Sequence, residues 1–343
     1  MHIPDGYLSP QTYAPAYGAM IALWAWASAK LKRTLRTRRV PMLALGAAFS
    51  FVIMMFNVPI PGGTSGHAVG SVLVAILLGP WAAMIAVSLA LIVQAVVFCD
   101  GGITAIGANC LSMAVVMPFA GWWVYRLIAG AAPAGSRRHV FGAAVGGYVG
   151  INAAAFVIAV MFGIQPLIAR DAMGHALYCP FPLQVAIPAM AVGHLLVFGF
   201  VEAAVTGLVV AHVQRTEPAL LATEEKTTKG RPLAIRRLVM GLVVLTLLSP
   251  LGLYLPARFG GGPAWGEWSA SEVTKLTGHT PSQLAKLSSL WCGPLPDYAP
   301  PGHEAASLPT LMLFYFVSAA VGISVIAAAT IGLRKLLARR QPL

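Results

Sequence analysis

The chain has 343 residues, of which 58% are hydrophobic and only 10% are charged, and its mean hydropathy is +0.76. A soluble domain of this length could not bury so much apolar surface, so the composition predicts an all-α polytopic membrane protein. The net charge of +12 would suit a nucleic-acid partner, but the basic residues are confined to loops, which excludes that interpretation.

Nine apolar stretches follow one another, and each is near the length that a hydrocarbon core requires. They cover residues 12–29, 42–56, 68–79, 81–98, 105–125, 140–164, 186–211, 238–255 and 308–332. The second and third are short, and they flank the Pro/Gly-rich segment 57–66. Because irregular backbone is tolerated in a membrane only where protein or a cavity surrounds it, we expect a site there.

The basic residues predict how these spans are oriented. With nine spans, nineteen of the 23 Lys and Arg residues fall in the segments on one side and four fall on the other side. By the positive-inside rule, the N-terminus is outside and the C-terminus is inside. The charge therefore indicates topology and contact with anionic lipid of the bilayer's inner leaflet.

Three parts are predicted: seven spans with short loops, a polar inner linker, and a two-span hairpin with a long outer loop, at residues 1–214, 215–237 and 238–343. In the outer loop we expect a soluble-looking helix over residues 271–289, capped by Ser269 or Ser271.

The first two residues offer three nitrogens to one metal ion. His2 is bulky, so we expect Met1 to be retained, and we expect no signal peptide. The Met1 amine, the His2 amide nitrogen and the His2 imidazole can close a five-membered and a six-membered chelate ring. Nitrogen donors suit Ni²⁺, Cu²⁺ and Co²⁺. The alternative is that Met-His is an ordinary start and that the terminus frays.

His67 follows the broken segment on the same predicted side as the terminus, so its imidazole can add a fourth nitrogen. The alternative is a loop or helix-capping histidine. In the seventh stretch, His194 and Glu202 are functional candidates because ionisable residues are costly in a membrane, although a hydrogen bond between helices explains them equally well. The remaining histidines are interpreted as solvated, with weak metal collection by the last three as an alternative: His139, His212, His175, His279 and His303.

Motifs for catalysis are absent from the sequence. There is no GxxxxGK[ST], HExxH or GxSxG motif, so we predict that the chain is not an enzyme and does not itself hydrolyse ATP. The four cysteines lack zinc-ligand spacing. A bridge between Cys179 and Cys292 would fit an oxidising exterior, but it is not the favoured interpretation.

Several segments resemble the CbiM/NikM family, the cobalt and nickel substrate-binding components of energy-coupling-factor (ECF) transporters. The opening MHIPDGYLSP and the loop NVPIPGGTSGH, at Asn57–His67, carry most of this resemblance, and Asp100–Asn109 and His194–Thr206 resemble two further family segments. The tail resembles the small N-type accessory subunit fused to the M component, through Ala264–Trp268 and Leu295–Tyr298.

The resemblance implies a subunit of the bacterial or archaeal cell (inner) membrane that captures Co²⁺ or Ni²⁺ as transported substrate. It implies the Met1 amine, the His2 amide nitrogen and imidazole, and the His67 imidazole as ligands. Residues expected to orient these ligands are Asp5, Asn57, Asn109, His194 and Glu202. The implied partners are a transmembrane coupling (T) subunit and two ATPase subunits.

Two rival functions are a stand-alone divalent metal channel and a membrane metal sensor. A channel needs ionisable residues along a path, whereas these spans contain little besides His194 and Glu202. The sequence does not separate cobalt from nickel. We further predict that the hairpin 238–343 packs on the first seven spans and controls loading or release without supplying ligands.

Overall fold

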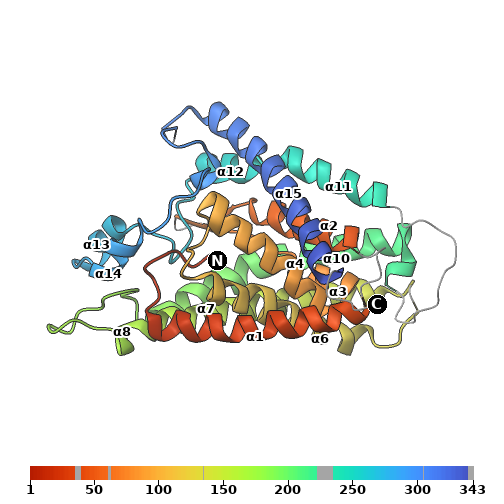
Figure 1. Cartoon of the computed structure of the whole chain (residues 1–343), viewed down its shortest axis with the longest axis horizontal. Coiled ribbons are helices and arrows are strands. Elements are labelled where there is room, and N and C mark those ends of the chain that lie inside the picture. The colour runs from red at the N-terminus through yellow and green to blue at the C-terminus, as the bar shows by residue number, and fades with distance from the viewer. Residues whose placement is uncertain (35–39, 61–62, 134, 222–234, 304, 339–343) are drawn as a thin grey trace.

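The computed structural model describes residues 1–34, 40–60, 63–133, 135–221, 235–303 and 305–338. The described residues are mostly helical, and most of the longer helices run roughly along the long axis of the molecule (Figure 1). The all-α fold class is therefore confirmed. The elements up to the linker are α1 (Pro10–Thr34), α2 (Val40–Met54), β1 (Val58–Ile60), β2 (Thr64–Gly66), α3 (Ser71–Leu78), α4 (Pro80–Val93), η2 (Gln94–Phe98), α5 (Ile106–Asn109), η3 (Cys110–Val116), α6 (Met117–Ala129), α7 (Arg137–Gly163), α8 (Gln165–Ile168), α9 (Leu183–Gly193), η4 (His194–Phe198), α10 (Gly199–Thr216) and η5 (Pro218–Leu220).

The hairpin contains α11 (Ile235–Leu248), α12 (Leu251–Phe259), α13 (Ala270–Thr277), α14 (Ser282–Leu287), η6 (Pro296–Tyr298) and α15 (Leu308–Ala338). Most of the predicted linker, residues 222–234, lies outside the described residues.

Within the described residues, six helical segments are long and apolar enough to cross a membrane: Pro80–Phe98, Ile106–Ala129, Arg137–Ile168, Leu183–Thr216, Ile235–Phe259 and Leu308–Leu333. Helix α2 is apolar but shorter. The chain is thus a multi-pass membrane protein, whereas the count of nine spans and their orientation stay predictions.

The predicted stretch 68–79 departs most from a full span. Its helix α3 has only 8 residues, because Gly70 precedes it in a left-handed conformation (φ 71°) and Gly79 (φ 87°) separates it from α4. Residues 71–75 of α3 are buried. Protein therefore surrounds this half-length helix, as irregular backbone in a membrane requires.

In the part of the chain that the structure describes, three π-helical turns interrupt the long helices. η2 ends the α4 span just before Asp100, η3 follows α5, and η4 begins at His194 between α9 and α10. Such turns often mark functional sites, because they change which side chains face the interior. Two of the three involve residues that were predicted from the sequence to belong to a site: η3 directly follows Asn109, and η4 begins at His194.

The broken segment forms a small structure that the sequence did not predict. Strands β1 and β2 pair antiparallel, with Val58 opposite Gly66 and Ile60 opposite Thr64. The C-terminal hairpin 238–343 contacts this pair of strands, since the Ser65 hydroxyl donates to the Gly262 carbonyl at 2.9 Å. His67 directly follows β2, so the pairing of the two strands determines where His67 lies.

The C-terminal hairpin packs on the rest of the chain through α2. Helices α11 and α15 both contact α2 (Figure 1), and the Tyr315 hydroxyl donates to the Met55 carbonyl at 2.7 Å. The outer loop of the C-terminal hairpin contains α13 and α14 and lies at the same end of the molecule as α8 (Figure 1).

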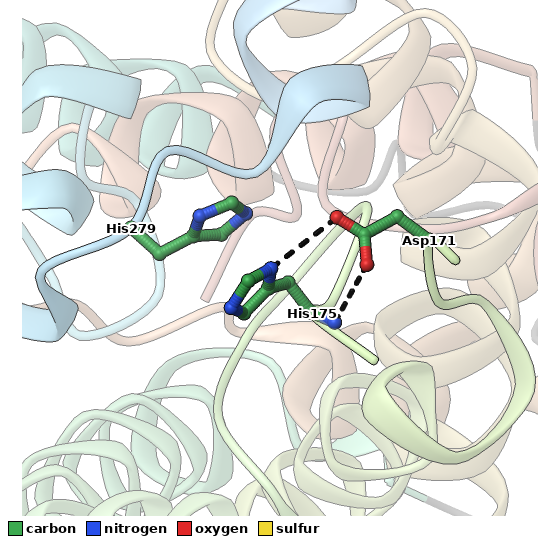
Figure 2. A group of neighbouring side chains, drawn as sticks. All are labelled: Asp171, His175 and His279. Carbon is green, nitrogen blue, oxygen red and sulfur yellow. Dashed lines mark hydrogen bonds and ion pairs between the residues drawn. The ribbon is translucent and has the colours of Figure 1, made fainter. Parts of the chain in front are cut away.

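The helix predicted over residues 271–289 is two helices. Gly278, with φ 71°, ends α13, and Pro281 precedes α14. Ser269 caps α13 as predicted. The turn between the two helices carries His279, whose ring lies against that of His175 (Figure 2).

The prediction for His139 was wrong. This residue is 3% exposed; the Tyr125 hydroxyl donates to its Nδ1 at 2.7 Å, and its Nε2 lies 3.1 Å from the Ala132 carbonyl oxygen. Tyr125, near the end of α6, packs on the start of α7 and buries His139. The basic residues next to His139 in the sequence gave no indication of this contact. All four cysteines are free, with Cys179 buried and Cys292 exposed.

Candidate metal centre

The N-terminus lies inside the molecule and does not fray. Met1 is 5% exposed and Ile3 is fully buried. The Ile3 amide donates to Asn109 Oδ1 at 2.9 Å, and Asn109 Nδ2 donates back to the Ile3 carbonyl at 3.2 Å. The Gly102 amide donates to the same carbonyl at 2.8 Å. The backbone directly after the first two residues is thus held on both sides.

Asp5 fixes the next part of the terminus. Its carboxylate accepts hydrogen bonds from the Ile103 amide at 3.0 Å and the Thr104 amide at 2.8 Å. This approach requires glycine at position 102, because a Cβ there would lie 2.2 Å from the Asp5 amide nitrogen. Two of the residues that we expected to orient the ligands, Asp5 and Asn109, therefore position the terminus.

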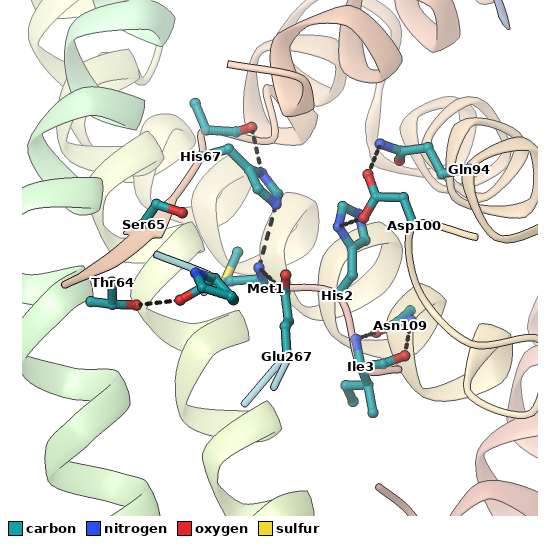
Figure 3. Close-up of polar contacts among 12 residues, drawn as sticks. Met1, His2, Ile3, Thr64, Ser65, His67, Gln94, Asp100, Asn109 and Glu267 are labelled. Atoms are coloured by element: carbon teal, nitrogen blue, oxygen red, sulfur yellow. Dashed lines mark hydrogen bonds and ion pairs between the residues drawn. The ribbon is translucent and has the colours of Figure 1, made fainter. Parts of the chain in front are cut away.

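The nitrogens of the predicted ligands lie close together in a buried space (Figure 3). The Met1 amine nitrogen is 3.4 Å from His67 Nε2. The rings of His2 and His67 stack with their centroids 4.9 Å apart, and both residues are less than 5% exposed. Residues that are 66 positions apart in the chain thus form one cluster of imidazole and amine nitrogens.

His67 presents a free lone pair to the Met1 amine. Its Nδ1 lies 3.1 Å from the Ala68 carbonyl oxygen, an acceptor, so Nδ1 carries the proton and Nε2 is unprotonated. Burial, the Met1 ammonium and His2 together hold the pKa of His67 well below 6.5. His67 is therefore neutral near pH 7, which a metal ligand must be.

His2 has one ring nitrogen engaged and the other without a partner. Its Nδ1 lies 2.7 Å from Asp100 Oδ1, whereas Nε2 is buried and finds no hydrogen-bond partner in the described part of the chain. Asp100 also accepts from Gln94 Nε2 at 3.1 Å and from the Tyr298 hydroxyl. Burial alone would raise the pKa of Asp100, but His2 brings it below the ordinary value and keeps the carboxylate ionised.

Glu267, from the hairpin, completes the surroundings of the amine. Its Oε1 forms an ion pair with the Met1 ammonium at 2.9 Å (Figure 3). Sequence reasoning missed Glu267 and Asp100 as members of the site. Both lie within segments that resemble the family, Ala264–Trp268 and Asp100–Asn109. That resemblance is the sequence feature that could have identified them.

Glu202 supports the segment that follows His67. Its carboxylate accepts from the Val69 amide at 2.8 Å and from the Gly70 amide at 3.1 Å, and the Thr206 hydroxyl donates to it at 3.4 Å. A carboxylate from α10 therefore caps the start of α3, which favours negative charge. Among the described residues, Glu202 accepts hydrogen bonds from Val69, Gly70 and Thr206, and none joins it to Met1, His2 or His67.

His194 lies on another wall of the site. Its Nδ1 is 2.8 Å from the Met190 carbonyl oxygen, and its Nε2 has no hydrogen-bond partner among the described residues. It lines a small pocket with Met1 and Trp265. Asn57 precedes β1, and no hydrogen bond joins its side chain to the described residues.

The arrangement can bind a late transition metal. The Met1 amine lies 3.4 Å from His67 Nε2, and the His2 ring stacks on that of His67. Amine and imidazole donors of this kind select Ni²⁺, Cu²⁺, Co²⁺ or Zn²⁺ rather than Mg²⁺ or Ca²⁺. Carboxylates and amides around the ligands hold them in place, as outer hydrogen-bond partners do at metal sites.

Comparison with known proteins agrees with this chemistry. The model of the family CbiM, "Cobalt uptake substrate-specific transmembrane region", matches residues 2–220. The chain is 47% identical to the fused nickel transport protein NikMN of Rhodobacter capsulatus over 99% of each chain. It is 46% identical to the probable fused nickel transport protein LarMN of Lactiplantibacillus plantarum over 80% of this chain and 79% of that protein.

A solved structure, the crystal structure of a truncated transition metal transporter, is 51% identical to the chain and superposes with a TM-score of 0.59. The match covers 63% of this chain and 99% of that one.

Proposed function

The chain belongs to the CbiM family, and we propose that it is the substrate-binding membrane subunit of an ECF-type importer for Ni²⁺ or Co²⁺. The ion is bound by the Met1 amine, the His2 amide nitrogen and imidazole, and the His67 imidazole. The observation that carries this proposal is the 3.4 Å approach of His67 Nε2 to the Met1 amine inside a buried site.

Loading the ion leaves the net charge of the site unchanged. Without metal, the Met1 ammonium contributes one positive charge next to Glu267. Binding removes one proton from the ammonium and one from the His2 amide while it adds two positive charges, so the set again carries one. A buried charge is costly unless it is paired, and Glu267 can pair with either state. Because two protons leave, binding weakens steeply as the pH falls.

The His2 ring turns when the ion binds. Only Nδ1 can close a six-membered ring with the amide nitrogen of the same residue, yet in the structure Nδ1 faces Asp100. Half a turn about the Cβ–Cγ bond brings Nδ1 to the ion and Nε2 toward the carboxylate side. Asp100 then orients the ligand from outside, as carboxylates do for metal-bound histidines.

Nickel is the favoured substrate. The fused relatives of Rhodobacter capsulatus and Lactiplantibacillus plantarum are named as nickel transport proteins. Two chelate rings that share the His2 amide nitrogen place three nitrogens near one plane, and planar nitrogen sites favour Ni²⁺ over Co²⁺.

The hairpin 238–343 acts as the accessory component that controls loading. It contacts the site at two points, where Glu267 pairs with Met1 and Tyr298 donates to Asp100. A third contact steadies the terminus, since the Tyr7 hydroxyl donates to the Trp268 carbonyl at 2.7 Å. Movement of the hairpin loop therefore changes the surroundings of the amine and of His2 together.

Transport requires partners, because the chain contains no ATP-binding loop sequence. A T subunit and two ATPase subunits supply the energy, and the basic inner loops dock them. The test is ⁶³Ni uptake by cells that express the chain with or without the coupling module. We expect uptake only with the complete module. An ATPase variant without its phosphate-binding lysine should abolish uptake at unchanged membrane levels, and persistent uptake would support a channel instead.

A further inference from the structure

A second group of metal donors lies apart from the Met1–His2–His67 site, where two loops meet. Asp171 and His175 come from the loop after α8, and His279 comes from the turn between α13 and α14 (Figure 2). One donor atom from each of the three residues lies within 4.8 Å of the others. The two rings stack with their centroids 4.2 Å apart, and His175 Nδ1 is 3.4 Å from Asp171 Oδ2.

The first loop is held by its own backbone. Arg170 and Ala176 form an antiparallel bridge. One oxygen of Asp171, Oδ1, accepts from the Met173 amide at 2.9 Å and from the His175 amide at 2.8 Å. Those bonds fix the carboxylate and leave Oδ2 directed at His175. The donor is therefore set in position before any ion arrives.

The second loop is docked on the first one. The amide of Gln283 donates to the Leu177 carbonyl at 3.0 Å, one residue beyond the bridge. His279 follows Gly278, whose left-handed conformation ends α13, and the Thr277 hydroxyl donates to the His279 carbonyl at 2.9 Å. The described contacts that hold the two loops involve backbone groups and the Asp171 and Thr277 side chains, not the imidazole rings. Binding of an ion would account for two imidazoles that meet at the surface.

The chemistry of the set fits a divalent transition metal. Two imidazoles and one carboxylate are borderline donors that suit Ni²⁺, Co²⁺ and Zn²⁺, and they leave coordination positions open to water. The side chains are partly exposed, at 46% for His175 and 28% for Asp171, so an ion can enter and leave directly from solvent.

We propose that Asp171, His175 and His279 form a second, solvent-exposed site for a divalent transition metal, which joins the hairpin loop to the loop after α8. The site collects the ion that the buried site later receives, and an ion there fastens α13 and α14 to the rest of the chain. The collecting role rests on the proposed function, whereas binding of an ion by Asp171, His175 and His279 does not depend on the ligand set of the buried site.

The test uses the full-length protein in detergent with Ni²⁺ alone, measured by equilibrium dialysis. The wild-type protein should bind two equivalents per chain, the weaker of which is lost in the His175→Ala/His279→Ala variant. His303→Ala is the matched control, because this histidine is exposed in the same hairpin loop, and it should keep both. In a His67→Ala background the weaker equivalent should remain. Equal stoichiometry in wild-type protein and the double variant would overturn the proposal, whatever the buried site does.

A second measurement separates a bridging ion from ordinary surface binding. Hydrogen exchange of the amides in residues 277–284 should slow when Ni²⁺ is added to wild-type protein and should not change in the His279→Ala variant. Asp171→Asn keeps an oxygen to accept the two amide bonds, so this variant should fold but lose the slowing. Unchanged exchange in the wild-type protein at saturating Ni²⁺ would show that no ion joins the two loops.

Discussion

The buried site around Met1 and the exposed group around His279 use the same residue types under opposite conditions. At the first, His2 and His67 are almost fully buried, and carboxylates, an amide and backbone groups surround them. At the second, the His175 side chain is 46% exposed, and among the described residues its ring contacts Asp171 and the His279 ring. The difference teaches that histidine content does not decide where an ion stays. Burial and outer hydrogen-bond partners do, because they fix the ligands and exclude water.

Both sites also contain residues of the hairpin, and the comparison shows two modes of contact. Glu267 meets the buried site as a counter-charge, whereas His279 meets the exposed group as a donor. The hairpin thus contributes to the surroundings of both groups.

The largest expected effect is that of removing a ligand of the buried site. His67→Ala should lower Ni²⁺ affinity by more than about 100-fold, since loss of even an outer partner of a ligand costs roughly 10–100-fold. Isothermal titration of purified protein measures this change. His303→Ala serves as the control, and a His67→Ala protein that binds as tightly as wild type at the buried site would exclude His67 as a ligand.

Weakening the carboxylate that holds His2 should have the next largest effect. Asp100→Asn should lower Ni²⁺ affinity by roughly 10–100-fold, because the amide cannot fix the imidazole as an ionised carboxylate does. Tyr298→Phe removes only one hydrogen bond to Asp100, so its effect should be smaller than that of Asp100→Asn. If both variants match wild type in the same titration, Asp100 does not orient the ligand.

The metal-free protein should lose stability in mild acid because of His67. Its folded-state pKa is lowered by burial, so the unfolded state binds more protons once the pH falls below 6.5. The contribution is about 1.4 kcal/mol per pH unit below that value. The pKa of Asp100 is also lowered, but its stabilisation is lost only below its unfolded value near 3.8. Between pH 7.5 and 5.5, the melting temperature should therefore fall less steeply for His67→Asn than for wild type. Parallel curves of melting temperature against pH would contradict a lowered pKa of His67 as the cause.

The smallest effect on affinity is expected at Glu267. Because the net charge beside it is the same with and without metal, Glu267→Gln should change Ni²⁺ affinity by only a few-fold. It should slow loading, since it cuts the ion pair between the hairpin and the Met1 amine. Stopped-flow measurement of Ni²⁺ binding separates the two effects, and a large affinity change with an unaltered loading rate would show that the charge argument is wrong.

Sequence reasoning brought the residues at the centre of the candidate site together but missed much of what surrounds them. Met1, His2 and His67 could be proposed as ligands because their chemistry is local: a terminal amine, a chelating histidine and a histidine at the end of a broken segment. Asp100, Glu267 and Tyr298 join the surroundings of the terminus through contacts between residues that are about 100 to 270 positions apart, and no sequence periodicity indicates such contacts.

The fold shows the same division. Apolar length predicted the long helices, because a membrane constrains length directly. The pairing of β1 with β2 and the burial of His139 under Tyr125 depend on tertiary packing. The break between α13 and α14 did have a local signal, since Gly278 ends α13 and Pro281 comes directly before α14.

The central claim is that the Met1 amine is itself a ligand, and lengthening the chain tests it most directly. A variant with one alanine before Met1 keeps every side chain but moves the amine and turns the Met1 nitrogen into an amide. Its Ni²⁺ affinity is compared by titration with that of a protein in which the same alanine is added after Leu343. We predict that the N-terminal addition abolishes high-affinity binding while the C-terminal addition leaves it unchanged. Equal affinity of the two proteins would contradict the account.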